Sequence, residues 1–239
     1  MATPLIPDKL RDLLLNQTFA SIEPDDRFLD DYRRSVKEYV SIENSVAVLS
    51  DLRLNRSYIY AGMFGGFFDL PLNGSIINSA FEENIFSKIH PDDLKERHTL
   101  ENEYFRLQTK LAINERLKYS TYCRLRAHNL KGENIYITHR TIYPKSLADG
   151  SVWLALCIYA PSTDLTSGKG IDGKIMNSET GEVIRVDKYC PKNKNFISER
   201  EREILLLIFK GVQSKNIAHR LNISINTVHR HRQNIIKKT

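Results

Sequence analysis

Apolar residues near the start of the chain recur three or four residues apart, the spacing that places them on one side of a helix. The pattern predicts two amphipathic helices, at residues 8–19 and 25–39. Their apolar positions are Leu10, Leu13, Leu14, Phe28, Leu29, Tyr32 and Val36. We expect both helices to pack against a core that the rest of the chain supplies.

Strand-like and helical segments follow along the chain. Residues 45–60 predict two strands around a Leu-Asn-Arg-Ser turn, because β-branched, aromatic and apolar residues flank that turn. A short helix is predicted at 81–90 and a longer one at 94–116. Apolar residues mark one side of each helix at Phe81, Ile85, Ile89, Leu100, Tyr104, Leu107 and Leu111.

Three strand-like runs come next, at 119–128, 135–143 and 151–159, and polar turns that contain glycine separate them. This order predicts an antiparallel meander. The last run contains VWLALCIY, which is apolar enough to be a central strand buried on both faces. The predicted fold class is therefore α+β, with an antiparallel sheet, flanking helices and a small all-α C-terminal domain.

Residues 163–195 are rich in Ser, Thr, Gly, Asp and Lys, which indicates a connector. Inside it, KIMN and EVIRV flank Ser-Glu-Thr-Gly and predict a small exposed hairpin. The predicted organisation is a helical segment at 1–39, a sheet domain at 40–162, this connector, and a helical domain at 196–239.

Helix-capping residues divide the C-terminal segment into three predicted helices. Ser198 and Glu201 form a capping box at the start of the first helix, Ser214 is expected to cap the second, and Ser224 the third. The positions expected to face their common core are Ile204, Leu205, Leu207, Ile208, Ile217, Ala218 and Leu221. Two short helices joined by about three residues, the second polar and basic, are typical of a helix-turn-helix unit that binds DNA.

The distribution of charge points to the same end of the chain. The formal net charge is +6 over 239 residues, but residues 192–239 carry eleven Lys or Arg and three Glu, which is +8. Residues 1–191, with 24 basic and 26 acidic residues, carry −2. A nearly neutral body joined to a strongly basic segment is expected when that segment binds a polyanion.

A helical wheel at about 100° per residue divides the third predicted helix into two sides. Val228 and Ile235 lie on the apolar side. The residues expected to face the bases are Asn226, His229, Arg230 and Gln233. Arg can make two hydrogen bonds to guanine, and Asn or Gln two to adenine. The residues expected to contact phosphates are Lys215, Ser224, Thr227, Lys237 and Lys238.

Residues 197–239, ISEREREILLLIFKGVQSKNIAHRLNISINTVHRHRQNIIKKT, resemble the LuxR-type DNA-binding domain, also called NarL or GerE. The matching positions are Ser198, Arg200, Glu201, Glu203, Leu205, Gly211, Ser214, Lys215, Ile217, Ala218, Leu221, Ser224, Thr227, Val228, His231, Ile235 and Lys238. The resemblance implies a bacterial transcription regulator with a scaffold helix at 215–221 and a recognition helix at 224–238. The family's base-facing positions correspond here to His229, Arg230 and Gln233.

One departure from the family concerns dimerisation. Members usually continue through a fourth helix that often forms the dimer contact, and the present sequence does not contain it. A homodimer is still expected. The resemblance leaves open whether the N-terminal domain forms it.

The element order from residue 40 to residue 162 resembles that of a PAS domain. The segment IHPDD at 89–93 is similar to a common PAS segment, and an arginine-bearing strand and a Lys-Gly-Glu turn follow it. The resemblance implies a sensor fold whose five-stranded antiparallel sheet either encloses a small-molecule ligand or mediates dimerisation. The aromatic residues that could line a pocket are Tyr58, Tyr60, Phe64, Phe67 and Phe68, although such clusters are more often simple core.

No cofactor and no metal are expected from the sequence. His90 precedes a Pro-Asp-Asp helix start, where histidine more often bonds local backbone than binds haem. Cys123 and Cys157 lie on predicted strands, where cysteine is usually a small apolar residue. The third cysteine is Cys190, and no C-x-x-C pair indicates zinc or a disulfide framework.

Several classes of protein lack their motifs here. No G-x-S-x-G, H-E-x-x-H, P-loop or kinase signature is present, so no enzyme and no catalytic residue is expected. A phosphoacceptor receiver domain needs alternating strands and helices, which are missing. No apolar run reaches the roughly 20 residues of a membrane span, and no signal-peptide pattern is present, so no membrane association and a cytoplasmic location are expected.

The sequence favours a transcription regulator that binds double-stranded DNA, with RNA polymerase as a further partner. Two alternatives stay open. One is a sigma-factor-like promoter-recognition protein, whose N-terminal part would be all helical. The other is a PAS protein-interaction module without specific DNA binding. The sequence identifies neither the signal nor the operator, nor whether transcription is activated or repressed.

Overall fold

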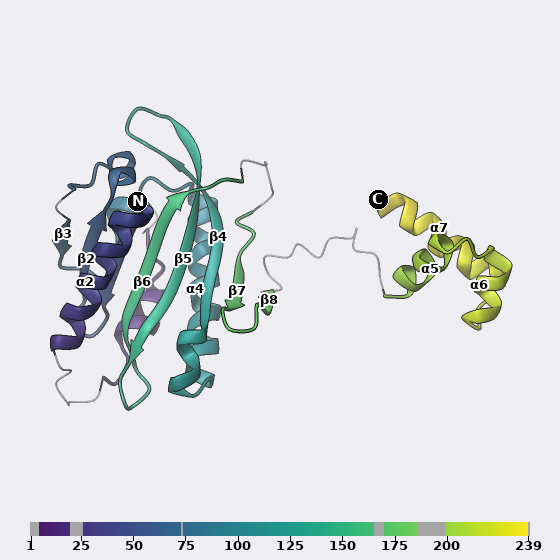
Figure 1. The fold of residues 1–239 in the computed structure, drawn as a ribbon, viewed down its shortest axis with the longest axis horizontal. Coiled ribbons are helices and arrows are strands. Elements are labelled where there is room, and N and C mark those ends of the chain that lie inside the picture. The colour runs from purple at the N-terminus through teal and green to yellow at the C-terminus, as the bar shows by residue number, and fades with distance from the viewer. Residues whose placement is uncertain (1–4, 20–25, 73, 165–169, 186–198, 239) are drawn as a thin grey trace. The chain divides into compact units, whose positions relative to one another are not determined.

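The computed structural model describes residues 5–19, 26–72, 74–164, 170–185 and 199–238. The chain divides into two compact units, residues 1–189 and 190–239, and each is described by itself (Figure 1). The N-terminal unit holds a sheet with helices, and the C-terminal unit is helical.

In the described part of the N-terminal unit, eight strands form an antiparallel sheet in the spatial order β3-β2-β1-β6-β5-β4-β7-β8. They are β1 (Val46–Asp51), β2 (Arg56–Ala61), β3 (Ser75–Ile77), β4 (Tyr119–His128), β5 (Asn134–Ser146), β6 (Val152–Pro161), β7 (Lys174–Asn177) and β8 (Val183–Arg185). Strands β4, β5 and β6 form the predicted meander. The predicted central strand is confirmed, because β6 lies between β1 and β5 and is buried along most of its length.

Helices cover both faces of this sheet, which is why β1 is buried at every position. They are α1 (Asp8–Leu15), α2 (Asp26–Glu43), α3 (Glu83–Phe86) and α4 (Pro91–Lys110), with the 3-10 helices η1 (Met63–Phe68) and η2 (Ile113–Lys118). Helix α2 packs on one face through Leu29 and Val36. Leu14, Ile85 and Leu100, from α1, α3 and α4, join the larger core on the other face. Figure 1 shows α2 and α4 on opposite sides of the sheet.

The long helix predicted at 94–116 is displaced toward the N-terminus. It begins at Pro91, because His90 takes the N-cap position and proline fits the first turn of a helix. The residues after α4 form η2 instead of continuing the helix. There the Arg116 side chain turns into the fold and donates to the carbonyl of Gly150 at 2.6 Å. The end of α4 thus coincides with a contact between Arg116 and a residue 34 positions further along the chain.

Strands β7 and β8 form the predicted hairpin, but the hairpin belongs to the sheet. Strand β7 pairs with β4, with Ile175 opposite Thr121. Ile171 and Ile175 are 0% and 2% exposed within the larger core. The expectation of an exposed hairpin inside a connector is wrong for β7, because Ile171 and Ile175 complete the core beside β4, whereas Val183 on β8 is 43% exposed.

Three helices form the described part of the C-terminal unit: α5 (Glu199–Phe209), α6 (Ser214–Arg220) and α7 (Ile225–Lys238). Their core comprises Ile204, Ile217, Ala218, Val228 and Ile235. The predicted fold class, an antiparallel sheet with flanking helices followed by a small helical domain, is confirmed. Among the described helices, none combines the length and the hydropathy that crossing a bilayer requires.

Candidate nucleic-acid interface

The end of α5 is fixed by a glycine. Gly211 has a φ of +75°, a region that favours glycine because it has no Cβ. The N–H groups of Gly211 and Val212 donate to the carbonyls of Ile208 and Leu207 at 2.9 and 3.0 Å. This pair of hydrogen bonds is a Schellman cap, which ends the helix and reverses the chain toward α6.

The turn between α6 and α7 depends on Asn222 and Ser224. Asn222 has a φ of +52°, and the N–H of Ile223 donates to the carbonyl of Ala218 at 3.0 Å, which closes α6. Ser224 Oγ accepts the N–H of Thr227 at 3.1 Å and caps α7, as predicted. Both sides of the turn are therefore capped, which holds α7 in a defined position relative to α6.

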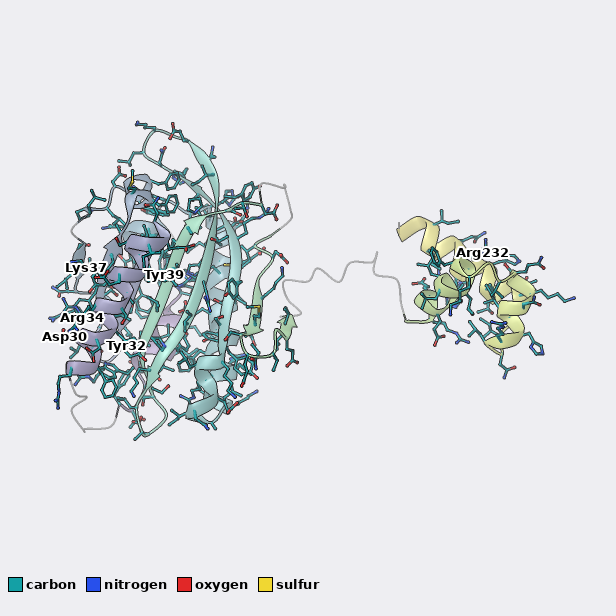
Figure 2. All side chains as sticks on the ribbon, viewed as in Figure 1. Asp30, Tyr32, Arg34, Lys37, Tyr39 and Arg232 are labelled. Atoms are coloured by element: carbon teal, nitrogen blue, oxygen red, sulfur yellow. The ribbon has the colours of Figure 1, made fainter. Side chains whose placement is uncertain are left out.

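Ser214 does not cap α6, which corrects the prediction. Gln213 occupies the N-cap position without a side-chain cap bond, and Ser214 is the first residue of the helix. Ser214 Oγ accepts instead from Arg232 Nη1 at 3.3 Å, so Arg232 ties α7 to α6 (Figure 2). The predicted cap at Ser198 lies outside the described residues.

The core-facing prediction for Leu205 is also wrong. Ile204 is fully buried, and Leu207 packs around the same core, but Leu205 is 37% exposed. The side of α5 that faces α6 and α7 carries Ile204, Leu207 and Ile208, which fall within about 100° of one another around the helix, and Leu205 lies outside that arc. At the start of α5, Arg200 Nη2 donates to the carbonyl of Leu221 at 2.6 Å, which fastens α5 to the end of α6.

The outward side of α7 presents the predicted base-facing residues. The exposed side chains there are Asn226, His229, Arg230 and Gln233. Their spacing of three and four residues places them along one side of the helix. On the opposite side, Val228 and Ile235 are 0% and 6% exposed. The structure therefore gathers these four residues on one accessible surface.

Three of the predicted phosphate contacts, Lys215, Ser224 and Thr227, lie near the starts of α6 and α7. Lys215 is exposed in the first turn of α6. The Ser224 hydroxyl lies 2.8 Å from the Thr227 hydroxyl while it also caps α7. An anion at this point would meet both hydroxyls together with the helix N-terminus. The side chains of Lys237 and Lys238 lie outside the described part of the chain.

No acidic residue offsets the positive charge of α6 and α7. Glu203 is the last acidic residue of the sequence, so residues 204–239 contain Lys and Arg but neither Asp nor Glu. Glu203 itself accepts from Arg200 at 2.7 Å, and Glu201 is 2% exposed. A polyanion would therefore approach these helices without local repulsion.

Two features that position α7 were not singled out from the sequence. Asn222 follows the predicted end of α6, and asparagine is the residue after glycine that most readily ends a helix in the left-handed region, so a local signal was present. The bond between Arg232 and Ser214 joins residues 18 positions apart and has no signature in local spacing.

In the N-terminal unit, His90 and two cysteines lie where the sequence predicts. His90 Nδ1 accepts the N–H of Asp92 at 3.3 Å as the N-cap of α4, which confirms a bond to local backbone. Cys123 and Cys157 are buried on β4 and β6.

The five aromatic residues do not line a single pocket. Phe64, Phe67 and Phe68 pack on one another with ring centroids 5.1 to 5.7 Å apart. Tyr58 belongs to a different cluster, with Trp153, under α2. Since the sheet separates the two groups, they are parts of the core on its two faces.

Comparison with known proteins agrees with the geometry of the C-terminal unit. Residues 195–239 match the family described as bacterial regulatory proteins, luxR family (GerE). The response regulator protein VraR of Staphylococcus aureus, from strains Mu3 / ATCC 700698 and NCTC 8325 / PS 47, is 35% identical over 83 residues, which cover 30% of this chain and 40% of VraR. This chain thus spans less than half the length of these curated relatives.

Solved structures align at lower identity. A sensory box histidine kinase/response regulator from Burkholderia thailandensis E264 aligns with a TM-score of 0.36 and 15% identity, over 54% of this chain and 85% of that chain. A VqmA dimer from Vibrio cholerae, in the absence of target DNA, aligns with a TM-score of 0.36 and 15% identity, over 86% of this chain and 80% of that chain. The helix-turn-helix geometry and the family match together identify the C-terminal unit as a luxR-type domain.

Proposed function

We propose that this chain is a bacterial transcription regulator that binds double-stranded DNA through its C-terminal unit. The outward side of α7 carries the proposal, because four exposed hydrogen-bonding side chains lie opposite the buried Val228 and Ile235. No acidic residue follows Glu203 to repel the DNA. In this arrangement α7 enters the major groove while α6 crosses the backbone.

The outward side chains suit particular base edges. Arg230 can donate two hydrogen bonds to O6 and N7 of guanine, and Asn226 and Gln233 can each bond N6 and N7 of adenine. His229 adds a ring nitrogen at the edge of the same surface. Such contacts select a sequence, so the operator is expected to contain guanine and adenine at neighbouring positions.

Phosphate contacts orient α7 in the groove. Lys215 from α6, and Lys237 and Lys238 from the end of α7, supply positive charge for the backbone. Ser224 and Thr227 supply hydroxyls at the N-terminus of α7, where helix geometry favours an anion. These contacts contribute to affinity and to its salt dependence, and they do not discriminate between bases.

In this proposal the N-terminal unit regulates DNA binding. Its five longest strands are adjacent, in the order β2-β1-β6-β5-β4, and helices flank them, which supports a PAS-like sensor or dimerisation domain. We infer a homodimer, because two copies of α7 would contact two half-sites. A small-molecule ligand of the N-terminal unit, and contact with RNA polymerase in the cytoplasm, complete the proposal.

The two alternatives make different demands. A sigma-factor-like protein would have an all-helical N-terminal part, and the sheet of residues 46–185 counts against it. A protein-interaction module would bind no DNA sequence selectively. Binding to duplex DNA that weakens steeply with salt, together with enrichment of one sequence, separates regulation of transcription from that second alternative.

The test begins with selection of duplexes from a random library by the full chain, followed by gel shifts on the selected operator. Arg230→Ala is expected to weaken operator binding about 5- to 150-fold, equivalent to about 1–3 kcal/mol, and to relax base preference. The control Arg34→Ala removes a guanidinium that is 75% exposed on α2 (Figure 2) and should leave binding unchanged. Equal loss on operator and random DNA contradicts a base contact, and failure to enrich any sequence contradicts specific recognition.

A further inference from the structure

The N-terminal unit buries a cluster of polar side chains between α4 and the sheet. Its members, each at most 5% exposed, are Glu82, Arg97, Glu101, His139 and Cys157. They come from the segment before α3, from α4, and from strands β5 and β6. Buried polar groups are normally hydrogen-bonded or bound to a metal, so the partners of each group matter.

The register of the sheet places His139 beside Cys157. His139 on β5 lies opposite Tyr159 on β6, and Cys157 precedes Tyr159 by two residues. Residues two apart on a strand face the same side, so Cys157 is the diagonal neighbour of His139. Glu82 reaches the same side of the sheet, where its Oε1 accepts the Tyr159 hydroxyl at 2.6 Å.

The cluster contains more carboxylates than basic groups to balance them. Arg97 pairs with Glu101, and its Nη2 lies 3.9 Å from Glu82 Oε1 and donates to Cys157 Sγ at 3.4 Å. One guanidinium therefore faces two carboxylates. A buried carboxylate without a full counter-charge is costly, so the cluster can accept a further positive charge.

Three side chains converge with atoms that bind metals. One ligand atom each from Glu82, His139 and Cys157 lies within 4.8 Å of the other two. His139 Nδ1 is 3.7 Å from Cys123 Sγ, while its Nε2 has no hydrogen-bond partner among the residues that the structure describes. In the neutral tautomer whose Nδ1 donates to Cys123 Sγ, Nε2 carries the lone pair, which is then available for a hydrogen bond or for a metal.

We propose that Glu82, His139 and Cys157 bind one zinc ion. Thiolate, imidazole and carboxylate are the ligands that zinc takes in proteins, whereas magnesium and calcium prefer oxygen alone. Zinc–ligand distances of about 2.0–2.3 Å place tetrahedral ligand atoms roughly 3.5 Å apart, so the widest pair would approach by about 1 Å. Three protein ligands leave a fourth position for water or a small ligand.

Charge and neighbouring groups fit this assignment. The Cys157 thiolate and the Glu82 carboxylate together balance the charge of the ion, and Arg97 stays paired with Glu101. Arg97 Nη2, which lies beside both anionic ligands, would orient them as an outer-shell donor. The sequence carries no local signal for this site because 57 and 18 residues separate the three ligands along the chain.

Cobalt reports the proposed thiolate ligand directly. The full chain, without a histidine tag, is stripped with a chelator and titrated with Co²⁺, whose thiolate complexes absorb in the near ultraviolet. One equivalent is expected to produce this band, and Zn²⁺ to abolish it. Cys157→Ser should remove the band, whereas the matched control Cys190→Ser should keep it. Glu82→Gln should weaken affinity by about 10- to 100-fold or more, since even outer-shell changes cost that much.

Two outcomes overturn the proposal: no band in the wild-type chain, or a band that persists in Cys157→Ser. Because that variant could fail to fold, X-ray absorption by zinc-loaded wild-type protein is the second measurement. One sulfur at about 2.3 Å with nitrogen and oxygen at about 2.0–2.2 Å is expected, and a shell of nitrogen and oxygen alone contradicts it. Neither measurement depends on DNA binding, so this inference and the proposed function fail separately.

Discussion

The two units of this chain hold their polar chemistry in opposite places. The N-terminal unit covers its sheet on both faces and buries Arg97, Glu101 and His139 between α4 and the sheet. The C-terminal unit has a small core and turns its polar groups, such as Arg230 and Gln233, toward solvent. An enclosed polar group contributes to folding as well as to any binding, whereas an exposed group can change with little effect on the fold. Substitutions of these polar residues should therefore lower the free energy of unfolding in the N-terminal unit, and in the C-terminal unit they should lower DNA affinity with little effect on stability.

Arg97→Met is expected to have the largest effect. It leaves Glu82 and Glu101 buried without the guanidinium, and loss of one partner of a buried ion pair costs about 3–5 kcal/mol. Trp153, the single tryptophan and 1% exposed, reports urea unfolding of this unit by fluorescence. The control Arg34→Met should change stability by no more than about 0.5 kcal/mol. An unchanged midpoint for Arg97→Met would show that the cluster is not coupled to folding.

Ile204→Ala tests whether the small core unfolds by itself. Truncation of a buried isoleucine costs about 2–5 kcal/mol, a large share of what a core of this size can supply. DNA binding and helical circular dichroism should therefore fall while the Trp153 transition keeps its midpoint. Leu206→Ala, at a side chain that is 54% exposed, is the control. A Trp153 midpoint that moves with Ile204→Ala would mean that the two units unfold together.

Low pH should lower the free energy of unfolding of the N-terminal unit, because His98 is buried there. Burial lowers the pKa of His98 to about 3, and the nearby charge of Arg97 adds to the effect. The unfolded chain binds a proton near pH 6.5 and the folded chain does not, so stability is lost as the pH falls from about 6.5 toward 3, by up to about 1.4 kcal/mol per pH unit. His98→Gln should flatten this part of a pH series of urea midpoints. His128→Gln, at an exposed histidine on β4, should leave the slope unchanged, and equal slopes in all three proteins contradict the assignment.

Ser224→Ala is expected to have the smallest effect, about 1 kcal/mol, because the Thr227 N–H loses its acceptor at the start of α7. Thermal unfolding of the C-terminal helices, followed by circular dichroism, measures it. Ser224→Asp separates two roles of this residue, since a carboxylate keeps the cap but repels phosphate. It should restore stability and still weaken DNA binding. If Ser224→Asp binds DNA as wild type does, the residue is a cap without a phosphate contact.

The sequence predicts the C-terminal unit well because local rules govern most of it. The period of α7 assigns Val228 to the core and Arg230 to solvent, and Ser224 caps as expected. Prediction fails where neighbouring apolar residues compete for one core, as at Leu205, and where a cap moves by one residue, as at Ser214. Ser214 is engaged by Arg232 from the next helix, a contact that local spacing does not contain, and a run of consecutive apolar residues in α5 does not reveal which of them will face the core.

In the N-terminal unit, contacts between segments distant in sequence decide more of the structure, so more of it escapes prediction from local patterns. The bounds of β4 are predicted to the residue, since alternation and flanking turns define it. The pairing of β7 with β4, and the meeting of Glu82, His139 and Cys157, depend on which strands become neighbours. Strand order is a property of the whole sheet, so no local pattern contains these contacts.

The pairing along β4 also bears on how this protein behaves at high concentration. Strand β7 occupies one end of its outer edge, the carbonyl of Ile171 accepts the N–H of Arg124 at 2.8 Å, and residues 88–90 bond Arg126 and His128. A ten-residue strand that could template the addition of strands from other molecules is thereby used up within the chain. The sheet ends instead at β3 and β8, each three residues long, which are poor seeds for fibres.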